Sequence, residues 1–299
     1  MDAVVRFEWR AWSAERLPVV EQALSRWVSA EAPAGLGDAM RYAVLDGGKR
    51  LRPLLVLAAS EAVNGNQQAA LRAACAVELI HAYSLVHDDM PCMDNDDLRR
   101  GKPTVHVRFG QAQALLAGDA LQALAFELLV PDDDRIPVAM QAGLCRLLAR
   151  ASGHQGMAGG QAIDLASTGV ALTEPQLHEM HRLKTGALLQ ASVLMGALCG
   201  GAAAGVQDAL TTYGAAVGMA FQVVDDILDV TADSATLGKT AGKDAAQEKP
   251  TFVSLMGLDR SRDYAQELLG QALTALDSSG LAHTTALRSL AGMVVNRDN

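Results

Sequence analysis

Apolar residues recur every three or four positions along most of this chain, with polar residues between them. This spacing is typical of amphipathic α-helices that pack around a shared core. No convincing run of strictly alternating apolar and polar residues, the pattern of a half-buried strand, is present. The pattern predicts helices over 3–30, 36–46, 51–63, 67–90, 104–129, 137–155, 173–200, 205–230, 259–277 and 281–296.

The breaks between these helices are turns rich in Gly, Pro, Asn and Ser, and none is long enough for an interdomain linker. The longest polar break, 233–250, contains Gly238, Gly242 and several lysines. We expect it to form a lid beside the site described below, with an ordinary surface loop as the alternative. The whole pattern predicts a single all-α domain over 1–299, a bundle of about ten helices around a central cavity.

Composition supports a helical protein, because half of the 299 residues are hydrophobic and only 4% are aromatic. The formal net charge of −9 argues against non-specific nucleic-acid binding. Cys75, Cys92, Cys145 and Cys199 have neither paired nor metal-ligand spacing, so we interpret them as buried small residues in a reducing compartment. The first ten residues do not form a signal peptide, and we expect a cytoplasmic protein.

One uncharged stretch, 185–207, is long enough to span a membrane. It is rich in Gly and Ala and contains Gln190 and Ser192, so it is only weakly hydrophobic. We therefore predict a buried central helix or a helix at a subunit contact, and no membrane span.

Two aspartate clusters carry the strongest chemical signal. The first is DDMPCMD at 88–94 and the second is DDILD at 225–229, and each follows an apolar, helix-like run. Carboxylates beside apolar helices are costly to bury unless a cation neutralises them, and Mg²⁺ prefers oxygen ligands and often binds phosphate as well. Either cluster alone has an alternative interpretation as a solvated helix end. Together they predict a site for a diphosphate held by several Mg²⁺ ions.

Helix geometry gives the two clusters different shapes. Asp225 and Asp229 are four residues apart and therefore lie on one helical face. Asp88 and Asp94 would diverge by about 120° on a straight helix. Pro91 lacks an N–H and clashes with the carbonyl one turn earlier, so we expect a bulge that turns Asp94 back towards Asp88.

Basic residues near these clusters are suited to bind phosphate. The segment RRGK at 99–102 follows the first cluster, and GGKRLRP at 47–53 places glycines, Lys and Arg at a helix start. Lys184 lies within an apolar helix, and we expect it to bind phosphate as well. The alternative is that its amine simply reaches the surface while its methylene groups stay buried. His81 lies seven residues before Asp88 on the same helical face, which favours a ligand over a core histidine. We therefore predict a second, metal-free diphosphate site at Lys49, Arg52 and Arg100, above an apolar interior suited to a hydrophobic tail.

The chain strongly resembles the trans-isoprenyl diphosphate synthases, and most closely the bacterial farnesyl diphosphate synthases. The resemblance covers essentially the whole chain. It implies the all-α isoprenoid-synthase fold, usually as a homodimer, and Mg²⁺ as cofactor, with three ions in the substrate complex and Mn²⁺ as a substitute. The matching segments are GGKRLRP at 47–53, HAYSLVHDDMPCMDNDDLRRGKPTVH at 81–106, GGQAIDL at 159–165, HRLKTGALL at 181–189 and FQVVDDILDV…LGK at 221–239.

The resemblance also implies a role for each matching position. The carboxylates expected to face Mg²⁺ are Asp88, Asp94, Asp225 and Asp229, with Asp89 and Asp226 in support. The implied ligands of the allylic diphosphate are Arg99, Lys184, Thr185, Gln222 and Lys239. The implied ligands of isopentenyl diphosphate are Lys49, Arg52, His81 and Arg100.

The implied reaction is the 1'-4 condensation of isopentenyl diphosphate with dimethylallyl and geranyl diphosphate. Metal and fixed cations stabilise the diphosphate as it leaves the allylic carbon, and the isopentenyl double bond attacks the resulting cation. A proton is then lost to the departing diphosphate. Closure of the lid excludes water from the cation.

Product length depends on the residues that precede Asp88 on its helix. An aromatic residue such as Tyr83 at this position resembles farnesyl synthases, and with Ser84 it would form the floor of the cavity. Tyr83 points about 140° from Asp88 on an ideal helix, so packing elsewhere is the alternative. We expect a C15 product, with a geranylgeranyl or geranyl diphosphate synthase as the alternative.

Two other classes share parts of this pattern. A class I terpene cyclase has the first aspartate motif, but its second motif differs from DDILD at 225–229. A cyclase also binds only one diphosphate, so it would not need the second anion site at 47–53. A non-catalytic subunit of a prenyl synthase is disfavoured because the aspartates of both motifs are intact.

Overall fold

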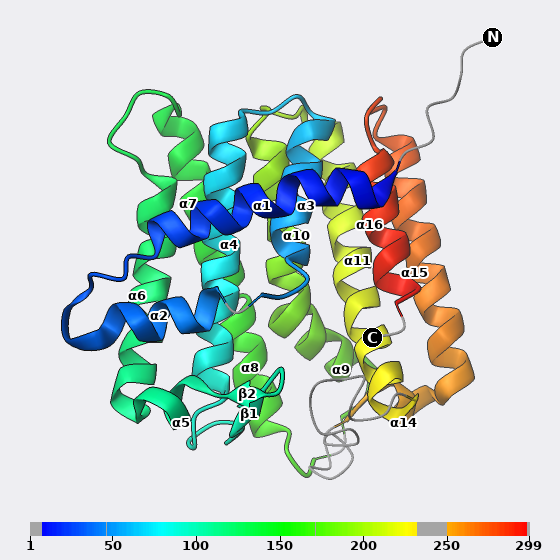
Figure 1. The fold of residues 1–299 in the computed structure, drawn as a ribbon. Coiled ribbons are helices and arrows are strands. Elements are labelled where there is room, and N and C mark those ends of the chain that lie inside the picture. Colours follow the sequence, from blue (N-terminus) through cyan, green and yellow to red (C-terminus); the bar gives the residue numbers. More distant parts are fainter. Residues whose placement is uncertain (1–7, 46, 171, 232–249, 298–299) are drawn as a thin grey trace.

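The computed structural model describes residues 8–45, 47–170, 172–231 and 250–297. In these ranges the regular structure is helical except for one short β-hairpin, which confirms the all-α prediction (Figure 1). The first part of the chain contributes α1 (Trp9–Trp27), η1 (Pro33–Gly35), α2 (Leu36–Val44), α3 (Leu51–Ala62), α4 (Gln67–Asp88), β1 (Leu98–Arg99), β2 (Lys102–Pro103), α5 (Val105–Phe109), α6 (Gln111–Leu129) and α7 (Val138–Ser152). The remainder contributes α8 (Met157–Ala166), α9 (Glu174–His181), η2 (Arg182–Gly186), α10 (Ala187–Leu198), α11 (Ala204–Thr231), α14 (Phe252–Met256), α15 (Leu258–Ser278) and α16 (Thr285–Val295).

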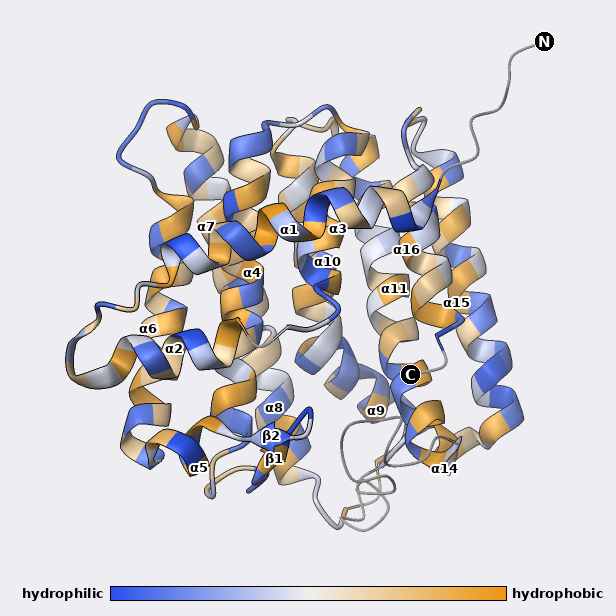
Figure 2. Cartoon of the chain, in the orientation of Figure 1, coloured by the Kyte–Doolittle hydropathy of each residue, from blue (hydrophilic) through white to orange (hydrophobic). Residues whose placement is uncertain are grey.

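Two apolar cores hold the helices together, and α1 crosses the front of the bundle in Figure 1. The first core lies around α4, α6 and α7 and contains the fully buried Leu79 and Leu121. The second lies around α3, α11, α15 and α16 and contains Leu55 and Leu287. In Figure 2 hydrophobic and hydrophilic residues are interspersed along most of the helices, as an amphipathic pattern requires. Each fully buried leucine stabilises the fold by roughly 1.5–3 kcal/mol relative to an exposed one.

The helix α10 lies between the two cores, which explains the uncharged stretch 185–207. Leu188 and Met195 belong to the first core, whereas Leu189 and Val193 belong to the second. A helix that is covered on both sides needs no polar face. The prediction of a buried central helix is therefore confirmed for Ala187–Leu198, whereas the stretch ends in a turn and the exposed start of α11.

Two other described helices, α4 and α6, are long and apolar enough to cross a membrane by length and composition alone. The most apolar window of α4 is 72% buried inside the protein, whereas that of α6 is only 39% buried. A mostly buried apolar helix such as α4 is what the core of a helical bundle requires.

Most predicted helices are present with ends shifted by a few residues, and two are interrupted. The helix predicted over 104–129 breaks at Gly110, whose φ of +88° separates α5 from α6. The helix predicted over 173–200 is π-helical in its middle, at η2. The helix predicted over 3–30 begins in residues 1–7, which lie outside the described ranges, and ends at Trp27.

Besides the short 3-10 helix η1, three features were not predicted from the sequence. The helix α8 lies in a glycine-rich stretch, and glycine disfavours helices by about 1 kcal/mol per residue, so its pattern was too weak. The hairpin of β1 and β2 pairs Leu98 with Pro103 and Arg99 with Lys102, and two-residue strands are too short to show an alternation. The third is α14, a single short helix of five residues.

The environment of the cysteines differs partly from the prediction. All four are free; Cys75 and Cys199 are buried as expected, but Cys145 is half-buried and Cys92 is exposed. The prediction for Cys92 was wrong because the helix ends before it and the residue lies on a surface turn.

Candidate active site

The first aspartate cluster lies where α4 ends. This helix stops at Asp88, two residues earlier than predicted, because Pro91 cannot continue it. The chain then folds back in a tight turn, in which the Asp94 N–H donates to the Asp88 carbonyl at 2.8 Å. The expected return of Asp94 towards Asp88 is therefore present, although a turn produces it and not a bulge within a longer helix.

The carboxyl group of Asp88 is strongly influenced by its neighbours. Burial raises its pKa to about 6, the positive charge of Lys184 opposes that shift, and the negative charge of Asp94 adds to it. A buried carboxylate that lies beside a second carboxylate favours a cation between the two. Lys184 is near enough to supply part of that charge.

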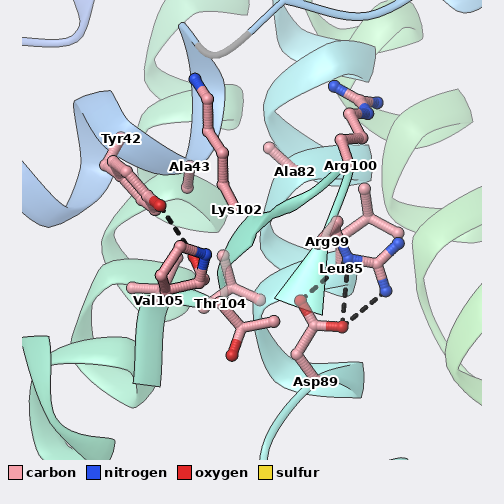
Figure 3. A pocket seen from close by; sticks show the side chains of 12 residues that line it. Tyr42, Ala43, Ala82, Leu85, Asp89, Arg99, Arg100, Lys102, Thr104 and Val105 are labelled. Atoms are coloured by element: carbon pink, nitrogen blue, oxygen red, sulfur yellow. Dashed lines mark hydrogen bonds and ion pairs between the residues drawn. The ribbon is translucent and has the colours of Figure 1, made fainter. Parts of the chain in front are cut away.

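The hairpin that follows the first cluster is fastened to Asp89. Arg99 on β1 donates from Nε to both carboxylate oxygens of Asp89, at 3.0 and 2.8 Å, and from Nη2 to Oδ1 at 2.5 Å, as Figure 3 shows. Asp89 is only 2% exposed. On the other side of the hairpin Tyr42 donates its hydroxyl to the Pro103 carbonyl at 2.7 Å. The small cavity in Figure 3 is lined by this hairpin together with Asp89 and Tyr42.

The second aspartate cluster lies on α11 and has its own buried support. Asp226 is 2% exposed and accepts hydrogen bonds from Gln222 Nε2 at 2.9 Å and from the Phe252 N–H at 2.7 Å. Gln222 in turn accepts a hydrogen bond from the Thr185 hydroxyl at 3.1 Å. Asp226 thus joins three elements, α11, α14 and η2, which fixes the carboxylates beside it.

The π-helical turn η2 connects the two clusters. Its Lys184 donates to Asp164 of α8 at 2.5 Å, and its Thr185 contacts Gln222 of α11. Two glycines allow this close packing, because a Cβ at Gly160 would lie 2.1 Å from the Lys184 nitrogen and a Cβ at Gly218 would lie 2.9 Å from the Gly186 Cα. Single π-turns within helices are often found at functional sites.

The GGKRLRP segment places its basic residues on opposite sides of the chain. Arg50 turns inward and binds Glu78 at 2.7 Å and Glu21 at 2.6 Å, so it has a structural role that the sequence did not predict. Gly48 has a φ of +133°, and a Cβ there would lie 2.8 Å from the guanidinium of Arg100. Arg100 also donates to the Gly47 carbonyl at 2.5 Å. Glycines are therefore required where the arginine of one loop crosses the backbone of the other.

The predicted metal-free anion site is brought together around His81. Burial lowers the pKa of His81 well below its usual value, and the nearby charges of Arg52 and Arg100 lower it further. Burial likewise lowers the pKa of Arg52. Burial and the charge of Arg297 lower the pKa of Lys49, which Asp225 raises. A cluster of cations that repel one another is suited to bind an anion.

The two residues expected to set product length lie on different faces of α4. The Tyr83 ring meets the His87 ring edge-on, with centroids 5.7 Å apart. Burial raises the pKa of the Tyr83 hydroxyl, and the nearby side chain of Gln122 on α6 opposes that shift. Ser84 donates its hydroxyl to the His81 carbonyl at 2.9 Å. Tyr83 is thus held between α4 and α6, close enough to Asp88 to feel its charge.

Two residues near the site were not singled out from the sequence. Asp164 was quoted only within a matching segment, and its pairing with Lys184 needed the fold to become visible. Arg297 forms an ion pair with Asp225 from outside every motif, and no sequence signal marks it. Lys239 and nearly all of the predicted lid at 233–250 lie outside the described residues.

Comparison with known proteins identifies the family. A model of the polyprenyl synthetase family matches residues 33–286. The chain belongs to the polyprenyl synthetase family. It is 50% identical over 279 residues to a probable farnesyl diphosphate synthase of Sinorhizobium fredii, covering 90% of this chain and 82% of that one. It is therefore a prenyltransferase.

Two further relatives bear on its product and ligands. A chloroplastic geranylgeranyl pyrophosphate synthase of Capsicum annuum is 44% identical over 294 residues, covering 98% of this chain and 80% of that one. The crystal structure of a geranyltransferase of Helicobacter pylori, complexed with magnesium and isoprenyl diphosphate, superposes with a TM-score of 0.83. It is 34% identical, and the match covers 98% of each chain.

The donor set fits Mg²⁺ that is shared with a substrate. Within the described residues no group of three or more His, Cys, Asp or Glu side chains is close enough to hold a metal ion by itself. Mg²⁺ is commonly bound by one or two carboxylates together with phosphate oxygens and water, and not by a cage of protein ligands. Asp88 and Asp94 provide such a partial set, with oxygen donors alone.

Proposed function

We propose that this prenyltransferase condenses isopentenyl diphosphate with dimethylallyl and then geranyl diphosphate, and releases (E,E)-farnesyl diphosphate and diphosphate. One arrangement carries the proposal, the turn η2 between the aspartate clusters. Burial raises the pKa of Asp88 in the first cluster, and the positive charge of Lys184 on this turn opposes that shift. The Thr185 hydroxyl donates a hydrogen bond to Gln222 beside the second cluster. A chain-elongating enzyme needs two adjoining anion sites, and Lys49 of the metal-free site lies beside Asp225.

The proposed cofactor is Mg²⁺, with Mn²⁺ as a substitute. Mg²⁺ would neutralise charge that develops on the departing diphosphate. The magnesium named in the complex of the Helicobacter pylori geranyltransferase supports this assignment. The carboxylates that would hold the ions are Asp88, Asp94, Asp225 and Asp229, while Asp89 and Asp226 stay bonded to Arg99 and Gln222.

The protein's own cations divide between the two diphosphates. Lys184, held by Asp164, supplies fixed positive charge to the allylic diphosphate as its carbon–oxygen bond breaks. Lys49, Arg52 and Arg100 bind the diphosphate of isopentenyl diphosphate. His81 is neutral in this environment and would act as a hydrogen-bond donor. The new bond joins C1 of the allylic cation to C4 of isopentenyl diphosphate, and the proton from C2 passes to the released diphosphate.

The C15 product is supported by Tyr83 and by the relative from Sinorhizobium fredii. The bulky ring of Tyr83 packs edge-on against His87 and lies near Gln122 of α6, which restricts its movement away from a growing chain. The geranylgeranyl pyrophosphate synthase of Capsicum annuum supports a C20 product as the second candidate.

Product analysis tests the proposed function directly. The purified chain is incubated with isopentenyl diphosphate, Mg²⁺ and each allylic primer, and the dephosphorylated products are separated by chromatography. We expect farnesol from the wild type and some geranylgeraniol from Tyr83→Ala, because the smaller side chain lets the product extend. Gln122→Ala is the matched variant, since it removes a side chain near the Tyr83 hydroxyl but keeps the ring. Mainly geranylgeraniol from the wild type would refute the C15 assignment.

We also propose a homodimer, with its contact surface on α6 and not on the stretch 185–207. The uncharged stretch 185–207 predicts a subunit contact as one of two possibilities, but its helix α10 is largely buried within one chain. By contrast α6 exposes Leu115 and Leu116 at 47% and 52%. An apolar helix that is only partly covered favours contact with another protein surface.

A further inference from the structure

Arg297 reaches the second aspartate cluster from outside the motifs. It follows α16, and its Nη2 donates to Asp225 Oδ1 and to the Phe221 carbonyl, the latter at 2.7 Å. Its guanidinium carbon lies 4.0 Å from the centre of the Phe221 ring. Phe221 is one turn before Asp225 on α11. Three contacts therefore fix a single arginine against the first carboxylate of the cluster.

The ion pair restrains only part of the carboxylate. The Arg297 side chain is 13% exposed and the Asp225 side chain is 38% exposed, so the aspartate is the more accessible partner. Arg297 bonds to Oδ1, and among the described residues Oδ2 forms no hydrogen bond. Lys49 and Arg52 lie near enough for Asp225 to influence both. One oxygen of Asp225 is thus open to a ligand while three cations surround the group.

We propose that Arg297 is a positioning residue that keeps divalent-cation binding at Asp225 weak until a diphosphate is present. The inference rests on the proposed function, because it takes Asp225 as a carboxylate that faces the metal. A cation that approaches Oδ2 meets a fixed positive charge on the neighbouring oxygen. A bound diphosphate supplies negative charge that offsets this repulsion, so cation and diphosphate bind together.

Removal of Arg297 would have two opposing effects on the site. Asp225 would lose an ordered side-chain conformation, which weakens cation binding slightly, because an aspartate has few torsions to order. The site would also lose a positive charge that repels a divalent cation with twice the energy felt by a monovalent one. The second effect is the larger, so the variant should bind divalent cations more tightly.

The test is a titration of the full chain with Mn²⁺, followed through the electron paramagnetic resonance signal of the free ion. Without diphosphate, Arg297→Met should bind Mn²⁺ roughly tenfold more tightly than the wild type, and Arg297→Lys should lie between them. Arg288→Met is the matched control, because Arg288 pairs with Asp277 and not with either cluster. With inorganic pyrophosphate present, and its own Mn²⁺ complex measured without protein, the difference should fall below about threefold.

Asp225→Asn separates a failure of this inference from a failure of the proposed function. If Asp225→Asn weakens Mn²⁺ binding while Arg297→Met binds no more tightly than the wild type, the role of Arg297 is wrong and the metal assignment stands. If Asp225→Asn leaves Mn²⁺ binding unchanged, the metal assignment itself fails. Thermal unfolding of each variant establishes that it is folded before titration.

Discussion

The two aspartates of each Asp–Asp pair have different surroundings. In both pairs the second residue, Asp89 or Asp226, is almost fully buried and bonded to groups of the protein. The first residue, Asp88 or Asp225, keeps its carboxylate nearer the surface of the site. The buried aspartate of each pair therefore anchors the local structure, whereas its neighbour is left available for ligands.

Because of this difference, we expect substitution of Asp226 to affect mainly stability and substitution of Asp225 to affect mainly turnover. Asp226→Ala should lower the free energy of unfolding by about 1–3 kcal/mol, because it leaves the buried Phe252 N–H without its acceptor. Asp225→Ala should change stability by less than about 1 kcal/mol, since its ion pair is partly exposed. Asp225→Ala should instead reduce turnover by about 10²-fold or more. Urea unfolding and steady-state rates of the two variants make the comparison, and equal stability losses would contradict it.

His181 gives a prediction for pH. Neither ring nitrogen has a hydrogen-bond partner among the described residues, and the ring packs on Phe252 with centroids 5.3 Å apart. Burial, together with the smaller effect of the Lys184 charge, lowers the pKa of His181 to about 3. The folded protein therefore resists protonation of this group, while the unfolded chain accepts a proton near pH 6.5.

Below about pH 6.5 the unfolded state binds a proton on His181 that the folded state does not bind. The free energy of unfolding therefore falls as the pH falls. Relative to His181→Phe, the wild type should lose roughly 1.4 kcal/mol for each pH unit between about 6 and 4. The measurement is the difference in unfolding free energy between the two proteins at several pH values, which cancels the titration of the carboxylates they share. A difference independent of pH would show that His181 titrates normally in the folded protein.

At the scale of elements, the π-turn η2 is the part on which the site depends most. It lies between α8 and α11, and glycines on both helices give it room. Its position sets Lys184 against the first cluster and Thr185 against the second. A small shift of η2 would therefore disturb both clusters together.

Gly160→Ala tests the packing of this turn. The added Cβ would lie 2.1 Å from the Lys184 backbone nitrogen, so η2 must move away from α8. We expect a loss of about 1–3 kcal/mol in stability and a lower turnover rate. Gly270→Ala on α15 is the matched control, because nothing lies within 4 Å of its added Cβ. That control should be stabilised by about 0.5–1 kcal/mol with unchanged turnover. Wild-type stability in Gly160→Ala would mean that the turn can adjust freely.

At the scale of the whole molecule, the two apolar cores and α10 between them leave one apolar helix, α6, only partly covered. On the same helix Gln122 lies near the Tyr83 hydroxyl, and Gly118 packs against His87, where a Cβ would lie 2.1 Å from the ring. One face of α6 thus supports α4 behind the first cluster, and its outer face carries Leu115 and Leu116.

If this outer face joins two chains, a charge placed on it should separate them. Leu116→Glu is expected to shift the protein from dimer to monomer in light scattering, because an uncompensated carboxylate is costly to bury in an interface. Val19→Glu on α1 is the control, since Val19 is similarly exposed at 49% but lies on another helix. A wild-type protein that is monomeric and active at the assay concentration would exclude the dimer.

The sequence by itself determined the helical class, the family and the residues of both aspartate clusters. It could do so because helical periodicity and side-chain chemistry are local properties, carried by spacings of a few residues. The return of Asp94 towards Asp88 was predictable for the same reason, since Pro91 acts on the turn immediately before it.

Only the tertiary structure decided which side chain of each cluster meets which partner. The pairs Lys184–Asp164 and Arg297–Asp225 join residues 20 and 72 positions apart, and nothing in the spacing marks them. The helix α8 was missed because glycines weaken its local pattern, yet close packing against η2 requires one of those glycines. Contacts between distant segments depend on how helices pack, and packing is a property of the whole chain, which local patterns do not encode.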